Sequence, residues 1–184
     1  NGIDIASEGP FIKGKNSSYL FNYRYSTLAL LSPILPPEAG VIKYQDLSFK
    51  MNFPTKKSGI FSFWGLLSED SQKHKAVTDY NKWKIEADMK DYNTKAGLGA
   101  IGLTNKIVVS KIVNIQSVVA ITGDKLLWKE KLSDSLGILH PTTDVNNYQY
   151  KVLGNTNILT KIGTRISNKT GFEYSSSFYN ADLK

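Results

Sequence analysis

The segment of this chain whose spacing comes nearest to a binding motif is Gly97-Leu98-Gly99-Ala100-Ile101-Gly102, which fits G-x-G-x-x-G. In dinucleotide-binding folds, glycines at this spacing hold a pyrophosphate between a strand and the helix that follows it. Here the next residues, 103–106, predict a turn that leads into another strand and not into a helix. We therefore interpret residues 97–102 as part of a strand whose small side chains allow close packing.

The two histidines, His74 and His140, each lie in a polar stretch that predicts a loop. A zinc site needs several His or Cys residues at ligand spacing, and the chain contains no Cys. His140 lies near Ser133 and Asp144, which are the residue types of a catalytic triad, but residue types without a defined geometry do not predict one. We interpret both histidines as solvated loop residues.

Three carboxylates, those of Glu86, Asp88 and Asp91, lie close together among several lysines. A calcium-binding loop requires the pattern D-x-D-x-D-G, which this stretch lacks. The mixture of charges is typical of a solvated strand end. The sequence therefore predicts no catalytic residue, no metal site and no cofactor, and we expect that the protein is not an enzyme.

The composition places the chain among folded proteins, with 184 residues of which 41% are hydrophobic and 21% are charged. The net charge of +7 is compatible with an anionic partner or with lysines placed in turns. No block of five or more Lys or Arg occurs, so we expect no nucleic-acid partner. No apolar run is long enough for a transmembrane helix, so a membrane span would need strands closed into a barrel. The chain begins without Met or a signal peptide, and we interpret it as a mature form or as an internal piece of a longer chain.

One unit is repeated four times along the chain: an alternating apolar and polar run, a short basic turn, and a second alternating run. Tyr19, Phe21 and Tyr23 share one face of such a run, while Asn22 and Arg24 share the other. A period of two over this length is typical of a β-strand and not of a helix. The sequence therefore predicts an all-β fold of about eight antiparallel strands, forming a single domain over residues 1–184. The predicted turns are residues 12–16, 55–59, 104–106 and 167–171.

Most of the runs have one apolar and one polar face, which fits a soluble sandwich as well as a membrane barrel. Three features favour the barrel. The runs are about 15–20 residues long, against a usual strand length of about 5–6. Aromatic residues flank both the short turns and the long loops, as they do at the two interfaces of a membrane. Short turns alternate with long polar loops, predicted at residues 68–84 and 129–146, and this is the plan of an outer-membrane barrel with its short turns in the periplasm.

Several segments carry a resemblance to a known family. Residues 8–11 and 18–26 (EGPF and SYLFNYRYS) resemble the early barrel strands of Bacteroidetes TonB-dependent outer-membrane receptors. Residues 44–50 with their return 59–66, residues 97–106 and residues 168–172 continue the likeness in order. The resemblance implies a barrel of about 22 strands closed by a plug, which imports large ligands. Nothing in this chain resembles the plug, so the resemblance implies a barrel segment that takes part in energised nutrient uptake.

This resemblance also implies a bacterial outer-membrane location and a set of partners. These partners are outer-membrane lipid, the plug domain with the remaining barrel strands, a TonB-type energising protein and a surface lipoprotein. Two alternatives stay open. One is a stand-alone eight-stranded outer-membrane barrel with a structural or adhesin-like role. The other is a soluble β-sandwich that binds carbohydrate on Trp64, Trp83 and Trp128.

The barrel interpretation assigns the two strand faces to different surroundings. Basic residues on the polar face are the candidates for a lumen, where they either favour anionic cargo or pair with Asp46, Glu173 or plug carboxylates. Few inward carboxylates balance them, so we expect the first and last strands to lie apart and to pair with other polypeptide. The lumen-facing candidates are Arg24, Lys50, Lys151, Lys161 and Arg165. The lipid-facing candidates are Phe21, Tyr23, Phe49, Phe53, Phe63, Ile115, Val119 and Ile158.

Overall fold

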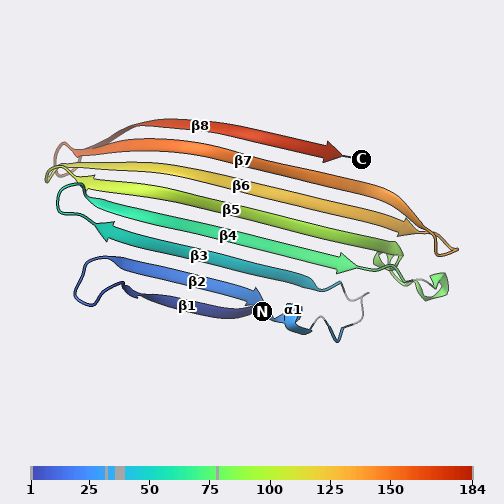
Figure 1. Ribbon diagram of the computed structural model, residues 1–184. Coiled ribbons are helices and arrows are strands. Elements are labelled where there is room, and N and C mark those ends of the chain that lie inside the picture. The colour runs from blue at the N-terminus through green and yellow to red at the C-terminus, as the bar shows by residue number, and fades with distance from the viewer. Residues whose placement is uncertain (1, 32, 36–39, 78, 184) are drawn as a thin grey trace.

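Eight antiparallel strands form a single sheet in the computed structural model, which describes residues 2–31, 33–35, 40–77 and 79–183 (Figure 1). Each strand pairs with the next one along the chain, so the strand order in the sheet is the order in the sequence. The predicted all-β fold of eight antiparallel strands in four hairpins is confirmed. The strands are β1 (Gly2–Pro10), β2 (Ser18–Ser26), β3 (Ile42–Pro54), β4 (Ile60–His74), β5 (Lys90–Val108), β6 (Val113–Ser133), β7 (Leu139–Lys161) and β8 (Ser167–Leu183).

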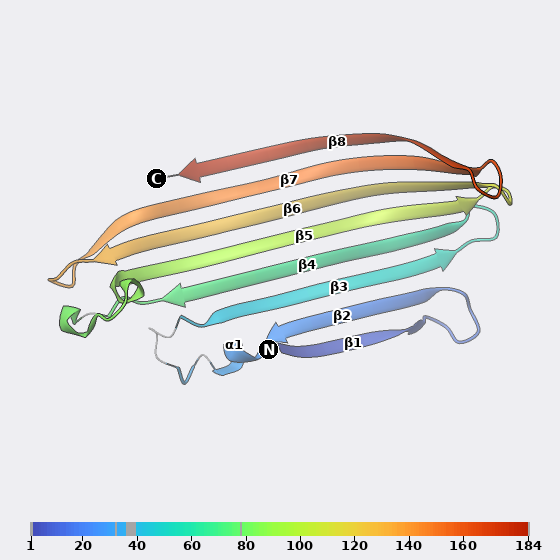
Figure 2. The same ribbon diagram turned by 180° about the vertical axis from the view of Figure 1, so that it is seen from behind.

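Short helices occur only in the connections, within the part of the chain that the structure describes. Helix α1 (Thr27–Leu31) follows β2, and two 3-10 helices, η2 (Tyr80–Lys82) and η3 (Glu86–Met89), lie between β4 and β5. Among the described residues, no helix has the length and apolar character needed to cross a membrane. The three helices lie at the end of the sheet opposite the turn that joins β1 to β2 (Figures 1 and 2).

The register of the sheet fixes which side chains share a face. Directly opposed residues in an antiparallel pair point to the same side, so a row can be followed from strand to strand. One such row passes from Tyr23 through Leu47 and Leu67. It continues through Gly99, Gly123, Tyr150 and Phe178. The alternating residues of neighbouring strands are therefore aligned, and the sheet has two continuous faces.

Two of the four predicted turns are placed correctly. The turn between β3 and β4 is residues 55–59, where the Thr55 backbone N–H donates to the Gly59 carbonyl at 2.8 Å. Gly59 has φ +78°, and a Cβ there would lie 2.2 Å from the Lys106 carbonyl oxygen, so glycine is required. The predicted turn at residues 12–16 lies within the connection of residues 11–17 between β1 and β2.

The other two turns, and one of the long loops, were predicted wrongly. Residues 104–106 lie inside β5, and the turn is at residues 109–112; residues 167–171 begin β8, and the turn is at residues 162–166. The predicted loop at 129–146 is mostly strand, because β6 runs to Ser133 and β7 begins at Leu139. The predicted loop at 68–84 is also strand as far as His74. In each case polar residues continue a strand rather than end it, because a strand with one solvated face accepts them.

The sheet is one layer thick, and neither face is covered by a second layer in the described part of the chain. Its buried hydrophobic side chains there are Ala120, at 2% exposure, and Val145, at 8%. A sandwich requires a second sheet that packs against the first across a shared core. The described residues supply one sheet only, which argues against the sandwich alternative.

Strands β1 and β8 form the two opposite edges of the sheet (Figures 1 and 2). No described residue of β1 pairs with β8, so the sheet is open. The expectation that the first and last strands lie apart is confirmed. That these edges pair with other polypeptide stays a prediction.

Candidate functional site

The structure places all eight lipid-facing candidates on one face of the sheet, here called the apolar face. The register connects them across the strands, for example Phe21 with Phe49, and Phe63 through Leu103 with Val119. Lys50, Lys151, Lys161 and Arg24 lie on the opposite face, here called the polar face. Arg165 was assigned to that face wrongly, because it lies in the turn of residues 162–166.

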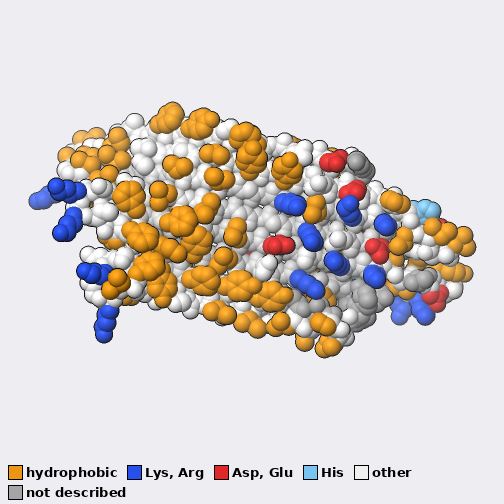
Figure 3. All heavy atoms as spheres, in the orientation of Figure 1, with side chains coloured by type: hydrophobic (Ala, Val, Ile, Leu, Met, Phe, Trp, Pro, Cys, Tyr) orange, Lys and Arg blue, Asp and Glu red, His pale blue; other side chains and the backbone are white. Residues whose placement is uncertain are grey.

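Hydrophobic side chains cover the half of the sheet nearest the short turns, and charged side chains gather over the other half (Figure 3). The apolar rings contact each other across strands: Phe49 and Phe63 have centroids 5.3 Å apart, and Phe11 stacks on Phe53 at 5.6 Å. At the far edge, Tyr150 stacks on Phe178 at 4.5 Å. These contacts lie on an exposed surface, since Val119 in the same band is 60% exposed.

The apolar band is shorter than the band of a typical transmembrane barrel. Along β4 the apolar positions run from Phe61 to Leu67, and along β7 from Tyr150 to Ile158. At about 3.4 Å per residue these lengths are about 20 and 27 Å along the strand. Transmembrane barrels have a band about 25 Å tall that is crossed by strands tilted about 35–45°, which takes about 31–35 Å of strand.

A hydrogen-bonded network crosses three strands on the polar face. The Arg24 guanidinium of β2 donates through Nε to Asp46 Oδ2 of β3 at 2.8 Å, and its Nη2 contacts the same oxygen. The Ser68 hydroxyl of β4 donates to Asp46 Oδ1. The guanidinium also lies over the Tyr44 ring, 5.5 Å from its centroid. Arg24 is therefore held by its neighbours, as one of the two interpretations of the basic lumen residues predicted.

The other predicted cations of the polar face have different surroundings. Lys50 is flanked in register by Leu20 and Trp64, and Lys151 by Thr122 and Ser177. Among the described residues, neither lysine forms an ion pair. The carboxylate of Glu173 accepts from the Asn155 amide at 3.4 Å instead.

The three tryptophans do not form one stacking platform. Trp64 lies on the polar face of β4, where its Nε1 donates to Thr104 Oγ1 at 3.0 Å. Ala120 of β6 lies in the same cross-strand row as Trp64. Trp128 is eight residues further along β6, so the two tryptophans are far apart on this face. Trp83 lies in the connection between β4 and β5, and its Nε1 donates to the Val77 carbonyl at 2.7 Å.

The glycine-rich segment lies in a strand, and His74 is held by contacts with its neighbours. Residues 97–102 lie within β5, so the expected strand is confirmed. His74 is buried, with Nδ1 2.8 Å from the Lys90 carbonyl oxygen and its ring stacked on Tyr92, so its prediction as a solvated loop residue is wrong. No group of three or more His, Cys, Asp or Glu side chains positioned to hold a metal occurs among the described residues.

The residue types of a triad are not brought together. His140 Nε2 lies 2.8 Å from Asp134 Oδ2, while Asp144 forms an ion pair with Lys129 at 3.1 Å. The hydrogen bond from His140, together with the backbone N–H groups of residues 138 and 136, lowers the pKa of Asp134 below its ordinary value. This carboxylate therefore organises the 134–138 turn.

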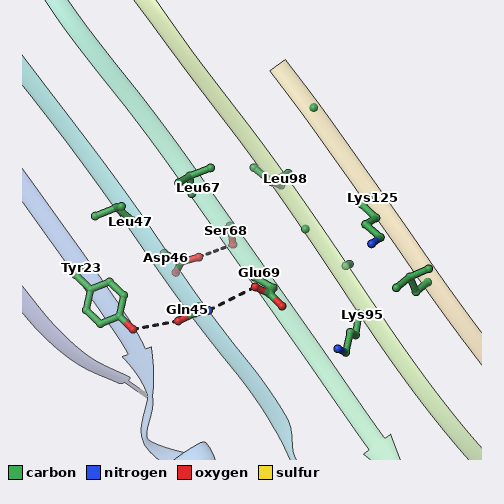
Figure 4. A pocket seen from close by; sticks show the side chains of 14 residues that line it. Tyr23, Gln45, Asp46, Leu47, Leu67, Ser68, Glu69, Lys95, Leu98 and Lys125 are labelled. Carbon is green, nitrogen blue, oxygen red and sulfur yellow. Dashed lines mark hydrogen bonds between the residues drawn. The ribbon is translucent and has the colours of Figure 1, made fainter. Parts of the chain in front are cut away.

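Sequence reasoning missed a depression on the apolar face, just beyond the apolar band (Figure 4). It has a volume of about 640 Å³ and spans β2 to β6. Leu47 and Leu67 line it toward the band, and Lys95 and Lys125 lie at its other side. The Tyr23 hydroxyl donates to Gln45 Oε1 at 3.1 Å, and Gln45 Nε2 donates to Glu69 Oε2 at 3.5 Å. The alternation along each run predicts that both lysines lie on the same face as the apolar residues. That they lie close together follows only from the register between β5 and β6.

Comparisons of the chain with protein-family models, curated proteins and solved structures found no match.

Proposed function

We propose that this chain is a segment of the transmembrane wall of a TonB-dependent outer-membrane receptor of the Bacteroidetes type, which takes part in nutrient uptake. The observation that carries the proposal is a single eight-stranded sheet with a continuous, exposed apolar band on one face and a hydrogen-bonded polar network on the other.

Lipid is the surrounding in which this apolar face is stable. Soluble monomeric proteins rarely expose a contiguous apolar patch larger than a few hundred Å². Here the patch extends over neighbouring strands and includes exposed Phe21, Phe63 and Val119. In water each of these side chains would be unfavourable, whereas in a bilayer they contact acyl chains.

The open edges support membership of a larger barrel. In a membrane an unpaired backbone N–H or C=O costs several kcal/mol, so an exposed edge strand in lipid is not stable. Strand β8 has 17 residues, and its outer edge has no partner among the described residues. Further strands of the same assembly would satisfy both this edge and that of β1.

The polar face suits a lumen that is occupied by other protein. Arg24, Asp46 and Ser68 satisfy one another, whereas Lys50 and Lys151 project without an ion-pair partner in the described part of the chain. Carboxylates of a plug domain would complement these two ammonium groups. A TonB-type protein would then supply energy through the plug, and a surface lipoprotein could deliver the cargo. In this function the chain binds and positions, and it performs no catalysis.

These 184 residues contain no cysteine, so pairs introduced among them can test closure once any cysteine elsewhere in the polypeptide has been replaced. In the full-length native polypeptide, Ala6→Cys with Asn22→Cys should cross-link, because these residues are directly opposed in β1 and β2. Ala6→Cys with Ser175→Cys or with Ser177→Cys should not cross-link if other strands separate β1 from β8. Efficient cross-linking of either second pair would support the stand-alone eight-stranded barrel.

Location and size complete the test. The native polypeptide should fractionate with the outer membrane, resist extraction by carbonate and migrate faster on gels before heating than after it. Its intact mass should exceed the 20.5 kDa of this chain. Recovery in the aqueous fraction without detergent, or a native mass near 20.5 kDa, would contradict the proposal.

A further inference from the structure

Charge is distributed unequally between the two faces in the half of the sheet nearest the helical connections. On the apolar face this half carries six lysines and four carboxylates, whereas on the polar face it carries two cations and five carboxylates. The six lysines, here called the lysine belt, are Lys43, Lys73, Lys95, Lys125, Lys129 and Lys131. The face that is apolar in one half is therefore basic in the other.

The lysine belt begins directly beyond the apolar band. Leu67, Gly99 and Gly123 form the last row of the band, and the next row on the same face contains Glu69, Gly97 and Lys125. Successive rows on one face are two residues, or about 7 Å, apart along the strand. The polar headgroup layer adds about 5–8 Å to each side of the hydrocarbon. In a membrane that immerses the band, Lys125 would lie at headgroup height.

The depression at this boundary has an apolar side and a basic side (Figure 4). Gly97 and Gly123 are part of its lining, and the open surface arises because neither has a side chain. A Cβ at Gly97 would meet only the Ser68 carbonyl oxygen, at 3.6 Å. Lys95 and Lys125 are exposed, and neither forms an ion pair with any residue that the structure describes.

We propose that the depression lined by Leu47, Leu67, Gly97, Lys95 and Lys125 binds a lipid with a phosphorylated headgroup, whose phosphate lies between the two lysines and whose acyl chains lie along the apolar band. The inference rests on the proposed function, because it requires this face to be in a membrane. Charge complementarity selects an anionic lipid over a zwitterionic one. Continuity of the depression with the band selects a lipid over a protein partner.

Glu69 provides a charge control of opposite sign. Its carboxylate lies across Gly97 from Lys125 in the same row and is hydrogen-bonded to the Gln45 amide. A carboxylate close to a bound phosphate opposes binding, so Glu69→Gln should strengthen it. A purely structural role for these side chains would not produce opposite effects from lysine and glutamate substitutions.

The test uses the full-length protein purified in a neutral detergent, with lipid A that carries two phosphates and phosphatidylcholine as the probes. Binding is measured by native mass spectrometry, after each variant has been shown to reach the outer membrane and to be heat-modifiable. The double variant Lys95→Gln/Lys125→Gln should bind lipid A about 30-fold more weakly, since each lysine near an anionic lipid contributes about fivefold. The control Lys56→Gln/Lys57→Gln removes the same charge from the turn at the other end of the sheet and should have no effect.

A second pair of variants tests the acyl part of the site. Gly97→Leu fills the depression without changing charge and should weaken lipid A binding. Gly154→Leu adds the same side chain to the apolar face at a position with nothing within 4 Å of its Cβ, and should leave binding unchanged.

The outcomes separate this inference from the proposed function. If the wild-type protein does not reach the outer membrane, the proposed function fails first. If it does, equal lipid A binding by the lysine double variant and its control would overturn the inference. Equal affinity for phosphatidylcholine, or complete displacement of lipid A by millimolar inorganic phosphate, would also overturn it, the latter by indicating a site for free phosphate. Retention of a co-purifying protein in place of lipid A would indicate a protein-binding surface instead.

Discussion

Two adjacent valines offer a direct test of the proposal that the apolar face of the sheet contacts lipid. Val119 lies in the middle rows of the apolar band, between Leu103 and Gly154 in register, and is 60% exposed. Val118 is half-buried on the polar face between Thr104 and Asn155. Replacing each valine by arginine adds the same side chain to the same strand, so the two variants differ only in the face that receives the charge.

We expect Val119→Arg to lower the free energy of unfolding by about 2–4 kcal/mol, the cost of a lipid-facing Arg near the midplane of a barrel. At the two ends of the band the cost would fall to about 0–1 kcal/mol, so the value also reports depth. Val118→Arg should cost less than about 1 kcal/mol, because its neighbours are polar and solvated.

The free energies would be measured by denaturant titration of the full-length protein folded into phosphatidylcholine vesicles, with the heat-dependent shift in gel mobility as the readout. A loss of about 2–4 kcal/mol corresponds to a change of about 30- to 900-fold in the folding equilibrium constant, well outside the error of the titration. Equal costs for the two variants, or a larger cost for Val118→Arg, would refute the assignment of the faces.

Three further results are expected. An epitope tag inserted after Lys57 should be hidden from antibodies on whole cells, whereas a tag after Lys82 should be accessible, because the two sites lie at opposite ends of the sheet; the reverse pattern would invert the topology. Gly59→Ala should destabilise the protein by about 1–3 kcal/mol, and Gly14→Ala by about 1 kcal/mol. Both glycines have positive φ, but only a Cβ at Gly59 would clash with backbone atoms. Equal losses of stability in thermal unfolding would contradict this expectation. Because the pKa of Asp134 is lowered in the folded state, its contribution to the 134–138 turn is fully present above the unfolded carboxyl pKa of about 3.9 and is lost as the pH falls through the folded value. The protection factors of amide hydrogens in that turn, which correct for the intrinsic pH dependence of exchange, should therefore fall on acidification, and Asp134→Asn should remove this pH dependence.

The faces of the strands could be predicted from the sequence, because a period of two leaves only one way to divide the side chains. A slip of one residue would have moved every aromatic residue to the opposite side, and the register shows no such slip at Phe21, Phe63 or Val119. The turn at residues 55–59 could also be predicted, since Gly59 supplies the positive φ that it requires.

The ends of the long strands could not be predicted in the same way. The polar residues at 104–106 were interpreted as a turn, yet they continue β5, where the Asn105 amide donates to the Ser58 carbonyl of the neighbouring hairpin turn at 2.9 Å. That contact joins residues 47 positions apart, so no local pattern contains it. The proximity of Lys95 and Lys125, which lie on the same face of β5 and β6 in neighbouring rows, depends in the same way on a register that only the folded sheet defines.

Strand length increases from 9 residues in β1 and β2 to 23 in β7. A tilted strand needs only about 9–11 residues to cross a bilayer, so β1 and β2 barely span it. By register, β7 extends 8 residues (139–146) beyond the row of Ser26 at the end of the sheet with the helical connections. As part of a barrel wall, this chain would give the receptor a lopsided rim, low beside β2 and raised by tens of ångströms along the β6–β7 hairpin. A large cargo or its carrier would then find the entrance shielded on one side and open on the other, so its direction of approach would be determined by the heights of the strands.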